Sequence, residues 1–418
     1  MNETRDLIIG IDFGKEYSQI CYYDRKAEEP RSIPVKVGSS QFEMPTCLCL
    51  REDQQTYCVG LEAEYFVKEK NGIMIDDLYE ISASEMPVSV VGENKMPWEL
   101  LAQFLKGMLK LTGVADVEHN IKCLAVSMET LDTVQIENLQ KACGELGISE
   151  SQCILLDYEE SFYYYVMTQK IETWNRSVGW YRFENTHVTF RKMTMSSGSR
   201  PVLVQLEEPV ETTLCDNAEE RDAEFYMFVK DTLGKDLYSS IQISGEGFDQ
   251  EWAKKSVKLL CYQRRKVYYG NNLFARGACG AGAERFVRRD LKEFRYMSRS
   301  LVLSDVGMDM RIMGAPAYYP LIESGKNWYE SSAYMELILD DTKELIFVVD
   351  TMGEAGKKRI VMALPGLPDR PSRTTRLGVS LQYISQSECR IKVKDLGFGE
   401  MFPSSGKEWT ETTRWEVL

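Results

Sequence analysis

Metal-ligating side chains are scarce in this sequence. It has two histidines, His119 and His187, which are remote from each other along the chain. The eleven cysteines form no C-x-x-C motif, and Cys47 and Cys49 are the only close pair. We therefore predict no metal site, and we expect the cysteines to be reduced, buried thiols rather than disulfides.

Long apolar runs are also missing. No stretch approaches the roughly 20 apolar residues that a helix needs to span a bilayer. The first residues, MNETRDLIIG, lack the basic segment, apolar segment and cleavage site that make up a secretory signal. These absences lead us to expect a cytoplasmic protein without a membrane partner.

Basic residues are fewer than acidic ones. The chain has 50 Lys and Arg residues against 64 Asp and Glu residues, which gives a net charge of -14. Such a surface repels nucleic acid and anionic membranes, so we expect neither as a partner. The densest acidic run, 207–224, and the densest basic run, 285–299, are typical of solvated loop and helix faces.

Apolar runs of strand length are abundant, and early in the chain they precede and alternate with helical patterns. Strands are predicted at 7–11, 19–23, 32–37, 46–50, 56–59, 121–127 and 153–156. A helix is predicted from Pro97, because apolar residues then recur at i, i+3, i+4 and i+7. Two more are predicted at 134–146 and through Phe162 and Val166.

The same pattern restarts after Trp174. Strands are predicted at 178–183, 187–193, 202–206, 240–244 and 266–269, and helices at 222–233, 251–261 and 274–287. Three strands followed by alternating helices and strands thus occur twice. The alternation predicts parallel strands with helices on the faces of each sheet, and the duplication predicts two related lobes.

The last part of the chain has a different hydrophobic pattern. Strand-like runs continue, and no periodic segment of helix length remains. The runs are 302–306, 334–339, 345–350, 359–364, 377–384 and 390–393. Glycine, proline and aspartate separate them. We therefore predict an all-β domain, most simply a sandwich.

In this arrangement the sequence resembles the seventy-kilodalton heat-shock chaperones (the DnaK-like family) of the actin-like ATPase superfamily. Residues 10–14, GIDFG, resemble the family's first phosphate loop. Residues 244–247, SGEG, resemble its adenosine loop, and 274–281 its following helix of small residues. Residues 364–368 and 390–395 are similar to parts of its β domain. The order and spacing of these motifs carry the resemblance, which covers essentially the whole chain.

The resemblance implies a fold of the α/β plus all-β class: a two-lobed, actin-like ATPase (ribonuclease-H-like) fold followed by a β sandwich. We expect lobe one at 1–170, lobe two at 171–298, an interdomain linker at 299–306 and a substrate-binding-like β sandwich at 307–418. The interval from Phe190 to Ser244 is too short for the family's outer α/β subdomain, so the second lobe is expected to be reduced. The sequence ends where the chaperones' helical lid would follow, so we expect a lidless form.

The residues that should carry the chemistry depart from the family. Such ATPases need donors around the phosphates, acids that order the metal's waters and a carboxylate that positions the attacking water. Asp12 is kept, either as such an acid or as a turn residue at a strand end. Lys15 and Glu16 replace phosphate-binding hydroxyls. The position of the catalytic glutamate falls on Tyr158, or on Glu159 if the alignment slips by one residue.

The second phosphate loop is altered as well. Residues 181–187, YRFENTH, contain no glycine, so their amides are not expected to cradle a phosphate. We therefore predict no catalytic residue and no cofactor, with a vestigial nucleotide site. Weak binding of ATP or ADP at its glycines is the alternative that remains open. The candidate residues of this site are Asp12, Gly14, Gly245, Glu246, Gly247 and Asn271.

The β domain offers candidates for binding an extended peptide. Alternation places Met308, Met310 and Ile312 on one face of a strand. Tyr318 and Tyr319 follow in the adjoining segment, and such adaptable and aromatic side chains suit apolar anchoring. We predict Met310, Ile312, Tyr318 and Tyr319 as peptide-binding residues. The alternative is that these side chains fill the core of the domain.

These features lead to one leading function and two alternatives. The leading hypothesis is a pseudo-ATPase, a non-hydrolysing chaperone-like protein that binds a protein or peptide client through its β domain. The alternatives are an ATP-binding DnaK-like chaperone with weak ATPase activity and an actin-like scaffold that assembles through its lobes. The missing phosphate glycines disfavour the first alternative, and the attached β domain disfavours the second.

Overall fold

The computed structural model describes residues 6–414 except 37, 115, 197, 199, 271 and 352–355. The chain divides into two compact units, Met1–Met297 and Ser298–Leu418. The first unit mixes helices and sheets, and the second is built from strands.

The first unit contains a sheet whose strands run in the order β11-β10-β1-β2-β3, with β4 paired to β2. Strand β1 is antiparallel to β2 and parallel to β10, and β10 is parallel to β11. The strands are β1 (Leu7–Phe13), β2 (Tyr17–Asp24), β3 (Glu29–Ser32), β4 (Met44–Pro45), β10 (Ile121–Met128) and β11 (Cys153–Asp157).

A second sheet in this unit repeats that order. Its strands run β17-β16-β12-β13-β14-β18, with β15 paired to β13. Strand β12 is antiparallel to β13 and parallel to β16, and β16 is parallel to β17. The repeated order that the sequence pattern predicts is therefore present. The strands are β12 (Ser177–Glu184), β13 (His187–Met195), β14 (Val202–Leu206), β15 (Val210–Thr213), β16 (Tyr238–Glu246), β17 (Lys266–Tyr269) and β18 (Phe294–Tyr296).

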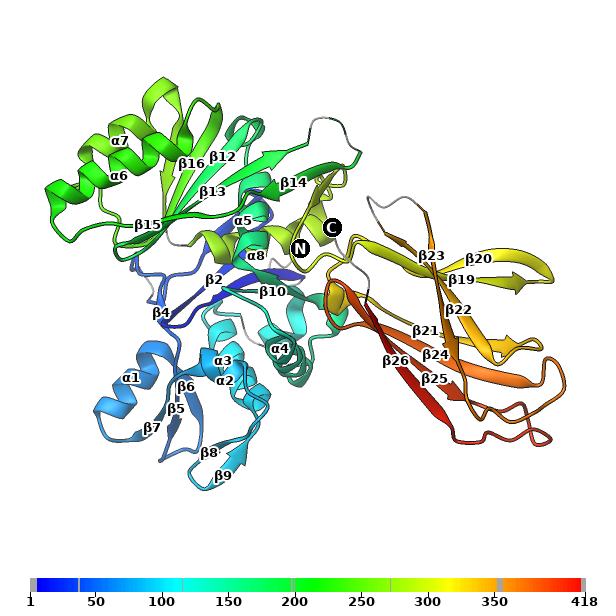
Figure 1. Cartoon of the computed structure of the whole chain (residues 1–418). Coiled ribbons are helices and arrows are strands. Elements are labelled where there is room, and N and C mark those ends of the chain that lie inside the picture. Colours follow the sequence, from blue (N-terminus) through cyan, green and yellow to red (C-terminus); the bar gives the residue numbers. More distant parts are fainter. Residues whose placement is uncertain are drawn as a thin grey trace. The chain divides into compact units, whose positions relative to one another are not determined.

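Helices follow the strands in the same order in both halves. They are α3 (Pro97–Lys110), α4 (Thr133–Glu145) and α5 (Tyr158–Met167), then α6 (Ala218–Leu233), α7 (Lys254–Leu260) and α8 (Leu273–Ala283). A π-helical turn, Glu284–Arg288, continues α8. Helices α6 and α7 cover one face of the second sheet through a buried aromatic cluster that includes Tyr181, Phe183 and Phe225 (Figure 1).

Helices α5 and α8 each pack on the sheet of the other half. Phe162 and Val166 of α5 share a core with Val178 and Trp180 of the second sheet. Small residues of α8 pack on the first sheet, where a Cβ on Gly10 would overlap the backbone of α8. Figure 1 draws both helices between the two sheets. The two halves of this unit are thereby held together by their final helices.

The first half carries an additional small subdomain between β3 and α3. It consists of β5 (Leu48–Arg51), β6 (Tyr57–Val59), α1 (Gly60–Lys68), β7 (Gly72–Ile75), α2 (Leu78–Ser82), β8 (Val88–Val90) and β9 (Glu93–Lys95). At the corresponding place in the second half, the described residues between Leu206 and Ala218 form only strand β15.

The prediction for the third strand of the first half has the wrong bounds. Strand β3 is Glu29–Ser32 rather than 32–37. The N–H of Ile33 still donates to the carbonyl of Ile20 in β2, but the N–H of Val35 donates to the carbonyl of Gln41 instead. Residue 37, the last of the predicted strand, lies outside the described residues. The apolar run at 32–37 includes Pro34, which lacks an N–H group for a sheet ladder.

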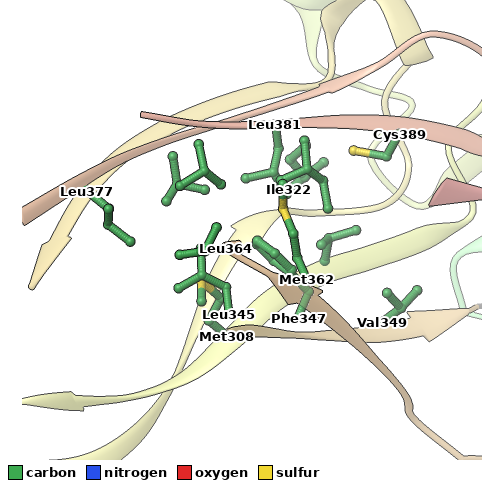
Figure 2. Close-up of a cluster of buried hydrophobic side chains, with 14 of the residues drawn as sticks. Met308, Ile322, Leu345, Phe347, Val349, Met362, Leu364, Leu377, Leu381 and Cys389 are labelled. Carbon is green, nitrogen blue, oxygen red and sulfur yellow. The ribbon is translucent and has the colours of Figure 1, made fainter. Parts of the chain in front are cut away.

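The second unit is a sandwich of two antiparallel sheets, ordered β20-β19-β22-β23 and β21-β24-β25-β26. Figure 2 shows side chains of the two sheets meeting in its core, with Met308 and Phe347 from one sheet and Leu377 and Leu381 from the other. The strands are β19 (Ser304–Ile312), β20 (Ala315–Ile322), β21 (Ser332–Leu339), β22 (Glu344–Thr351), β23 (Lys358–Ala363), β24 (Thr375–Tyr383), β25 (Glu388–Asp395) and β26 (Glu408–Arg414).

The segment expected as a linker, 299–306, is part of this sandwich in the structure. Val302 and Val306 are fully buried in its core, and Ser304 begins strand β19. The backbone of Val302 also bonds to Lys326 and Gly325. The apolar character that suggests a linker therefore serves the packing of the β domain.

All eleven cysteines are free thiols, and nine of them are buried, the exceptions being Cys215 and Cys261. Among the described residues, no group of three or more His, Cys, Asp and Glu side chains is arranged to hold a metal ion. In the same part of the chain, no helix is both long enough and apolar enough to cross a membrane.

Candidate functional site

Asp12 lies near the end of β1, on the same face as Gly10, which contacts α8. Its side chain is buried, with 6% of its surface exposed. The phenol of Tyr158, the first residue of α5, donates a hydrogen bond to Oδ1 of Asp12 at 2.8 Å. The Tyr158 ring in turn stacks on Phe274 of α8, with 3.6 Å between ring centroids. Tyr158, which the resemblance assigns to the catalytic-glutamate position, thus closes over Asp12.

Burial changes the protonation of this pair. Removal from water raises the pKa of Asp12 to about 7, against the opposing effects of the Tyr158 hydrogen bond and the Arg182 charge. Burial and the neighbouring Asp12 raise the pKa of Tyr158 well above its usual value, so the phenol keeps its proton. Near neutral pH, Asp12 is divided between its neutral and charged forms. It is therefore a weaker partner for a metal's water shell than an ionised carboxylate.

A chain of ion pairs lies beside Asp12 and Tyr158. Glu129, which directly follows β10, binds Lys15 at 3.1 Å and Arg182 of β12 at 2.6 Å. Arg182 also binds Glu184 at 3.0 Å, and its guanidinium lies 5.3 Å from the centre of the Tyr158 ring. The two cations closest to this pair in the network, Lys15 and Arg182, are thus already neutralised by carboxylates. This network links the first sheet to the second.

Glu159, the other candidate for the catalytic position, is also engaged. Its carboxylate accepts a hydrogen bond from the guanidinium of Arg191 on β13. The Arg191 side chain is nearly buried, with 10% of its surface exposed. A carboxylate held in this ion pair is not free to orient a water molecule.

The stretch that the resemblance places at the second phosphate loop, residues 181–187, forms a tight hairpin between β12 and β13. Glu184 pairs with His187, so Asn185 and Thr186 make the turn. The backbone N–H of Asn185 donates to the carbonyl of Glu246, and the carbonyl of Thr186 accepts from Leu214. These backbone groups are therefore used to join the hairpin to its neighbours.

The glycines of the predicted adenosine loop have a structural explanation. Gly245 and Gly247 have φ angles of 90° and 104°. A Cβ on Gly245 would overlap the carbonyl of Phe183, and one on Gly247 would overlap the carbonyl of Asn185. Both glycines let β16 approach the β12 hairpin closely, so their presence does not require a nucleotide.

The remaining nucleotide candidates are scattered around these elements. Gly14 is buried at the turn from β1 into β2, where a Cβ would overlap the carbonyl of Tyr17 and lie 3.4 Å from the Tyr158 hydroxyl. Glu246 is exposed at the end of β16. Asn271 lies outside the described residues. Sequence reasoning missed Glu129, although an acid directly after a buried strand parallel to β1 is a recognisable signal.

The predicted peptide-binding residues lie on the β19–β20 hairpin, but on two faces. Met308 faces Tyr319 across the hairpin, and Met310 faces Ala317. Alternation therefore places Met310, Ile312 and Tyr319 on the face that leads into the sandwich core. Met308 is buried in that core and Met310 packs against it, whereas Ile312 and Tyr319 are 40% and 41% exposed.

Tyr318 belongs to the opposite face. It pairs with Asp309, and its ring covers Gly307, where a Cβ would lie 2.5 Å from the Tyr318 hydroxyl. The ammonium of Lys357 lies 4.8 Å from the centre of the Tyr318 ring. A single groove on one face of the hairpin therefore cannot include all four predicted residues.

Comparison with known proteins gives two matching family models. One covers most of the first compact unit, and the other covers most of the second. A domain of unknown function (DUF8552) matches residues 301–415. No curated protein matches the chain. The C-terminal model of a family of unknown function (DUF5716) matches residues 29–299, which is more than half of the chain. The chain therefore belongs to the DUF5716 family.

Proposed function

We propose that this chain is a non-hydrolysing relative of the heat-shock chaperones, with an actin-like ATPase fold, and that it binds an extended protein segment through its β sandwich. The observation that carries the non-hydrolysing part is the hydrogen bond from Tyr158 to the buried Asp12. Phosphoryl transfer in such enzymes needs that acid ionised and open to the metal's waters, and it needs a carboxylate rather than a phenol beside it.

The topology supports the actin-like assignment. Both sheets of the first unit share one strand order and one pattern of strand directions. Helices α5 and α8 pack across onto the opposite sheets, with Gly277 of α8 touching the backbone of Ser161 in α5. A cleft between two related lobes is the arrangement that the resemblance implies.

The ion-pair network disfavours a working ATP-dependent chaperone, the first alternative. Lys15 and Arg182 share the carboxylate of Glu129, so a phosphate would have to displace a carboxylate that is already bound to both. It would also approach Glu184, whose like charge repels it. The two cations that a phosphate would need are thereby neutralised by the chain's own carboxylates.

The first experiment measures thermal unfolding of the full chain with and without Mg-ATP. A nucleotide present at about 100 times its Kd stabilises a protein by about 2.7 kcal/mol, which is readily seen as a rise in Tm. We expect no rise. A dose-dependent rise that disappears in the Asp12→Ala variant would show that nucleotide binds at this site and would favour the ATP-binding alternative, whose hydrolysis is then measured by phosphate release.

The peptide-binding part rests on the exposed apolar side chains on one face of the β19–β20 hairpin. Ile312 and Tyr319 lie on one face beside the partly buried Met310 and are themselves open to solvent. An extended peptide places alternate side chains on one face, so its apolar residues can reach these two. Strand β20 contains Pro316 and Pro320, which lack N–H donors, so side-chain anchoring is expected to outweigh backbone pairing along its free edge.

The second experiment uses the two faces of the hairpin as each other's control. A fluorescein-labelled peptide of alternating leucine and threonine is titrated with the full chain, and its anisotropy is followed. We expect Ile312→Asp and Tyr319→Asp to abolish binding, because each places a charge on the apolar face. Tyr318→Asp, on the opposite face, should retain it. Equal loss in all three variants, or no binding by the unsubstituted chain, would contradict the proposal.

A further inference from the structure

The outer side of the second half of the first unit contains an open groove. It lies between strand β15 and helix α6 and consists of two adjoining cavities of about 430 Å³ and about 530 Å³. Both cavities are lined by Thr212 of β15 and by Phe228 and Asp231 of α6. We call this the β15–α6 groove. Its lining residues include neither Asp12 nor any residue of the β sandwich.

The groove has an apolar floor that reaches the surface. Val210 of β15 and Met227 of α6 line it and are 50% and 51% exposed. Phe228 is partly buried next to them. Single exposed apolar residues are ordinary, but Val210 in one cavity and Met227 in the adjoining one, with Phe228 lining both, provide a place for apolar side chains of a partner.

The rim of the groove is strongly acidic. Among its lining residues, a single basic side chain, Lys192, already pairs with Asp236 at 2.6 Å and with Glu207 at 3.4 Å. The exposed side chains of Glu208 and Asp231 add negative charge on either side of the hollow. The acidic lining residues are Glu207, Glu208, Glu211, Glu224, Asp231 and Asp236.

We propose that the β15–α6 groove is a docking site for a basic, amphipathic segment of another protein. Apolar side chains of the segment contact Val210 and Met227, and its lysine or arginine side chains pair with the surrounding carboxylates, Glu208 and Asp231 among them. Charge complementarity selects this partner, because the rim repels acidic segments and nucleic acid and attracts basic ones. The inference does not depend on the function proposed for the Asp12 site or for the β sandwich.

The probe is a fluorescein-labelled peptide of alternating lysine and leucine, titrated by anisotropy with the full chain. A peptide of alternating glutamate and leucine serves as the opposite-charge control. We expect the lysine peptide to bind and the glutamate peptide not to bind. Affinity should fall as salt is raised, since the contribution of exposed charges is screened.

A matched pair of double variants separates the groove from the overall acidity of the protein. Glu208→Lys with Asp231→Lys reverses two charges at the groove, and Glu145→Lys with Glu150→Lys reverses two exposed charges elsewhere. We expect the groove variant to weaken binding about tenfold or more, and the distant variant to change it less than about twofold. A third variant, Met227→Ser, keeps the charge and should also weaken binding.

Two outcomes would overturn the inference. Equal weakening by both double variants would show that the lysine peptide follows the net charge rather than a site. Self-association of the chain that the groove variant abolishes, in sedimentation at increasing protein concentration, would identify the occupant as a second copy. Circular dichroism of each variant identifies any that fail to fold, and Met227→Ser then provides a test that introduces no charge.

Discussion

Tyr158 donates a hydrogen bond to Oδ1 of Asp12 at 2.8 Å, and this bond joins the first turn of α5 to the end of strand β1. We predict that Tyr158→Phe lowers the free energy of unfolding by about 1–3 kcal/mol, because the buried carboxyl loses its donor. Denaturant unfolding measures this change. Tyr262→Phe, at an exposed tyrosine, is the control and should have little effect. Equal stability of the Tyr158→Phe variant and the unsubstituted chain would refute the structural role of this bond.

The raised pKa of Asp12 gives a pH dependence with a defined sign. Burial raises this pKa from 3.8 to about 7, although Tyr158 and Arg182 oppose the shift and Glu43 and Glu129 reinforce it. The folded chain therefore holds a proton that the unfolded chain releases. The stability contributed by the protonated form is complete below the unfolded pKa and is lost as the pH rises through about 7.

Asp12→Asn removes this titration and tests its sign. The variant should gain stability relative to the unsubstituted chain as pH rises, by at most about 4 kcal/mol above the folded pKa. The comparison is made by urea unfolding of both proteins at about pH 5 and about pH 8. A stability difference that does not change between these two conditions would contradict the assignment of a raised pKa to Asp12.

The ion pair between Arg182 and Glu129 should contribute to the stability of the first unit. We predict that Arg182→Met destabilises it by about 3 kcal/mol, because Glu129 is then left partly buried with Lys15 as its remaining cation. A matched substitution at the exposed pair of Arg376 and Glu336 should cost less than about 1 kcal/mol. A double-mutant cycle with Glu129→Gln isolates the coupling between the two side chains. A coupling near zero would mean that the network is incidental.

A substitution at Gly245 tests whether this glycine is needed for the backbone packing or for binding a ligand. Gly245→Ala should destabilise the protein by about 1–3 kcal/mol or more, because the residue has a φ of 90° and its Cβ would overlap the carbonyl of Phe183. Gly144→Ala is the matched control, since this helical glycine has open space around it and the change should be neutral or stabilising. Thermal melts of the two variants provide the comparison, and a harmless Gly245→Ala would argue against the close approach of β16 and β12.

Much of the strand order was predictable, because apolar runs of strand length and helical periodicity are local properties of the sequence. Strand β20 was missed for a local reason: Pro316 and Pro320 made the segment resemble a loop. An apolar run at 299–306 fits both a linker and a core segment. Only the fold shows that Val302 and Val306 fill the core of the β sandwich. Sequence periodicity identifies which residues are buried more readily than it identifies what they are buried against.

The candidate site was harder to predict than the strands. Asp12 and Tyr158 were both singled out from the sequence, but their hydrogen bond depends on α5 lying across the end of β1, a long-range relationship that no local pattern reports. The pairing of Arg182 with Glu129 likewise needs two sheets to face each other. Alternation placed Met310 and Ile312 on one face correctly, whereas the separation of Tyr318 from Tyr319 depends on hairpin register.

Phosphate release from Mg-ATP tests the central claim most directly, because hydrolysis requires the chemistry that Tyr158, Asp12 and the Glu129 network are proposed to prevent. The full chain and its Asp12→Ala variant are assayed side by side over a range of nucleotide concentrations. The account predicts that neither protein releases phosphate above the background of the buffer. Saturable release by the unsubstituted chain that Asp12→Ala abolishes would contradict it.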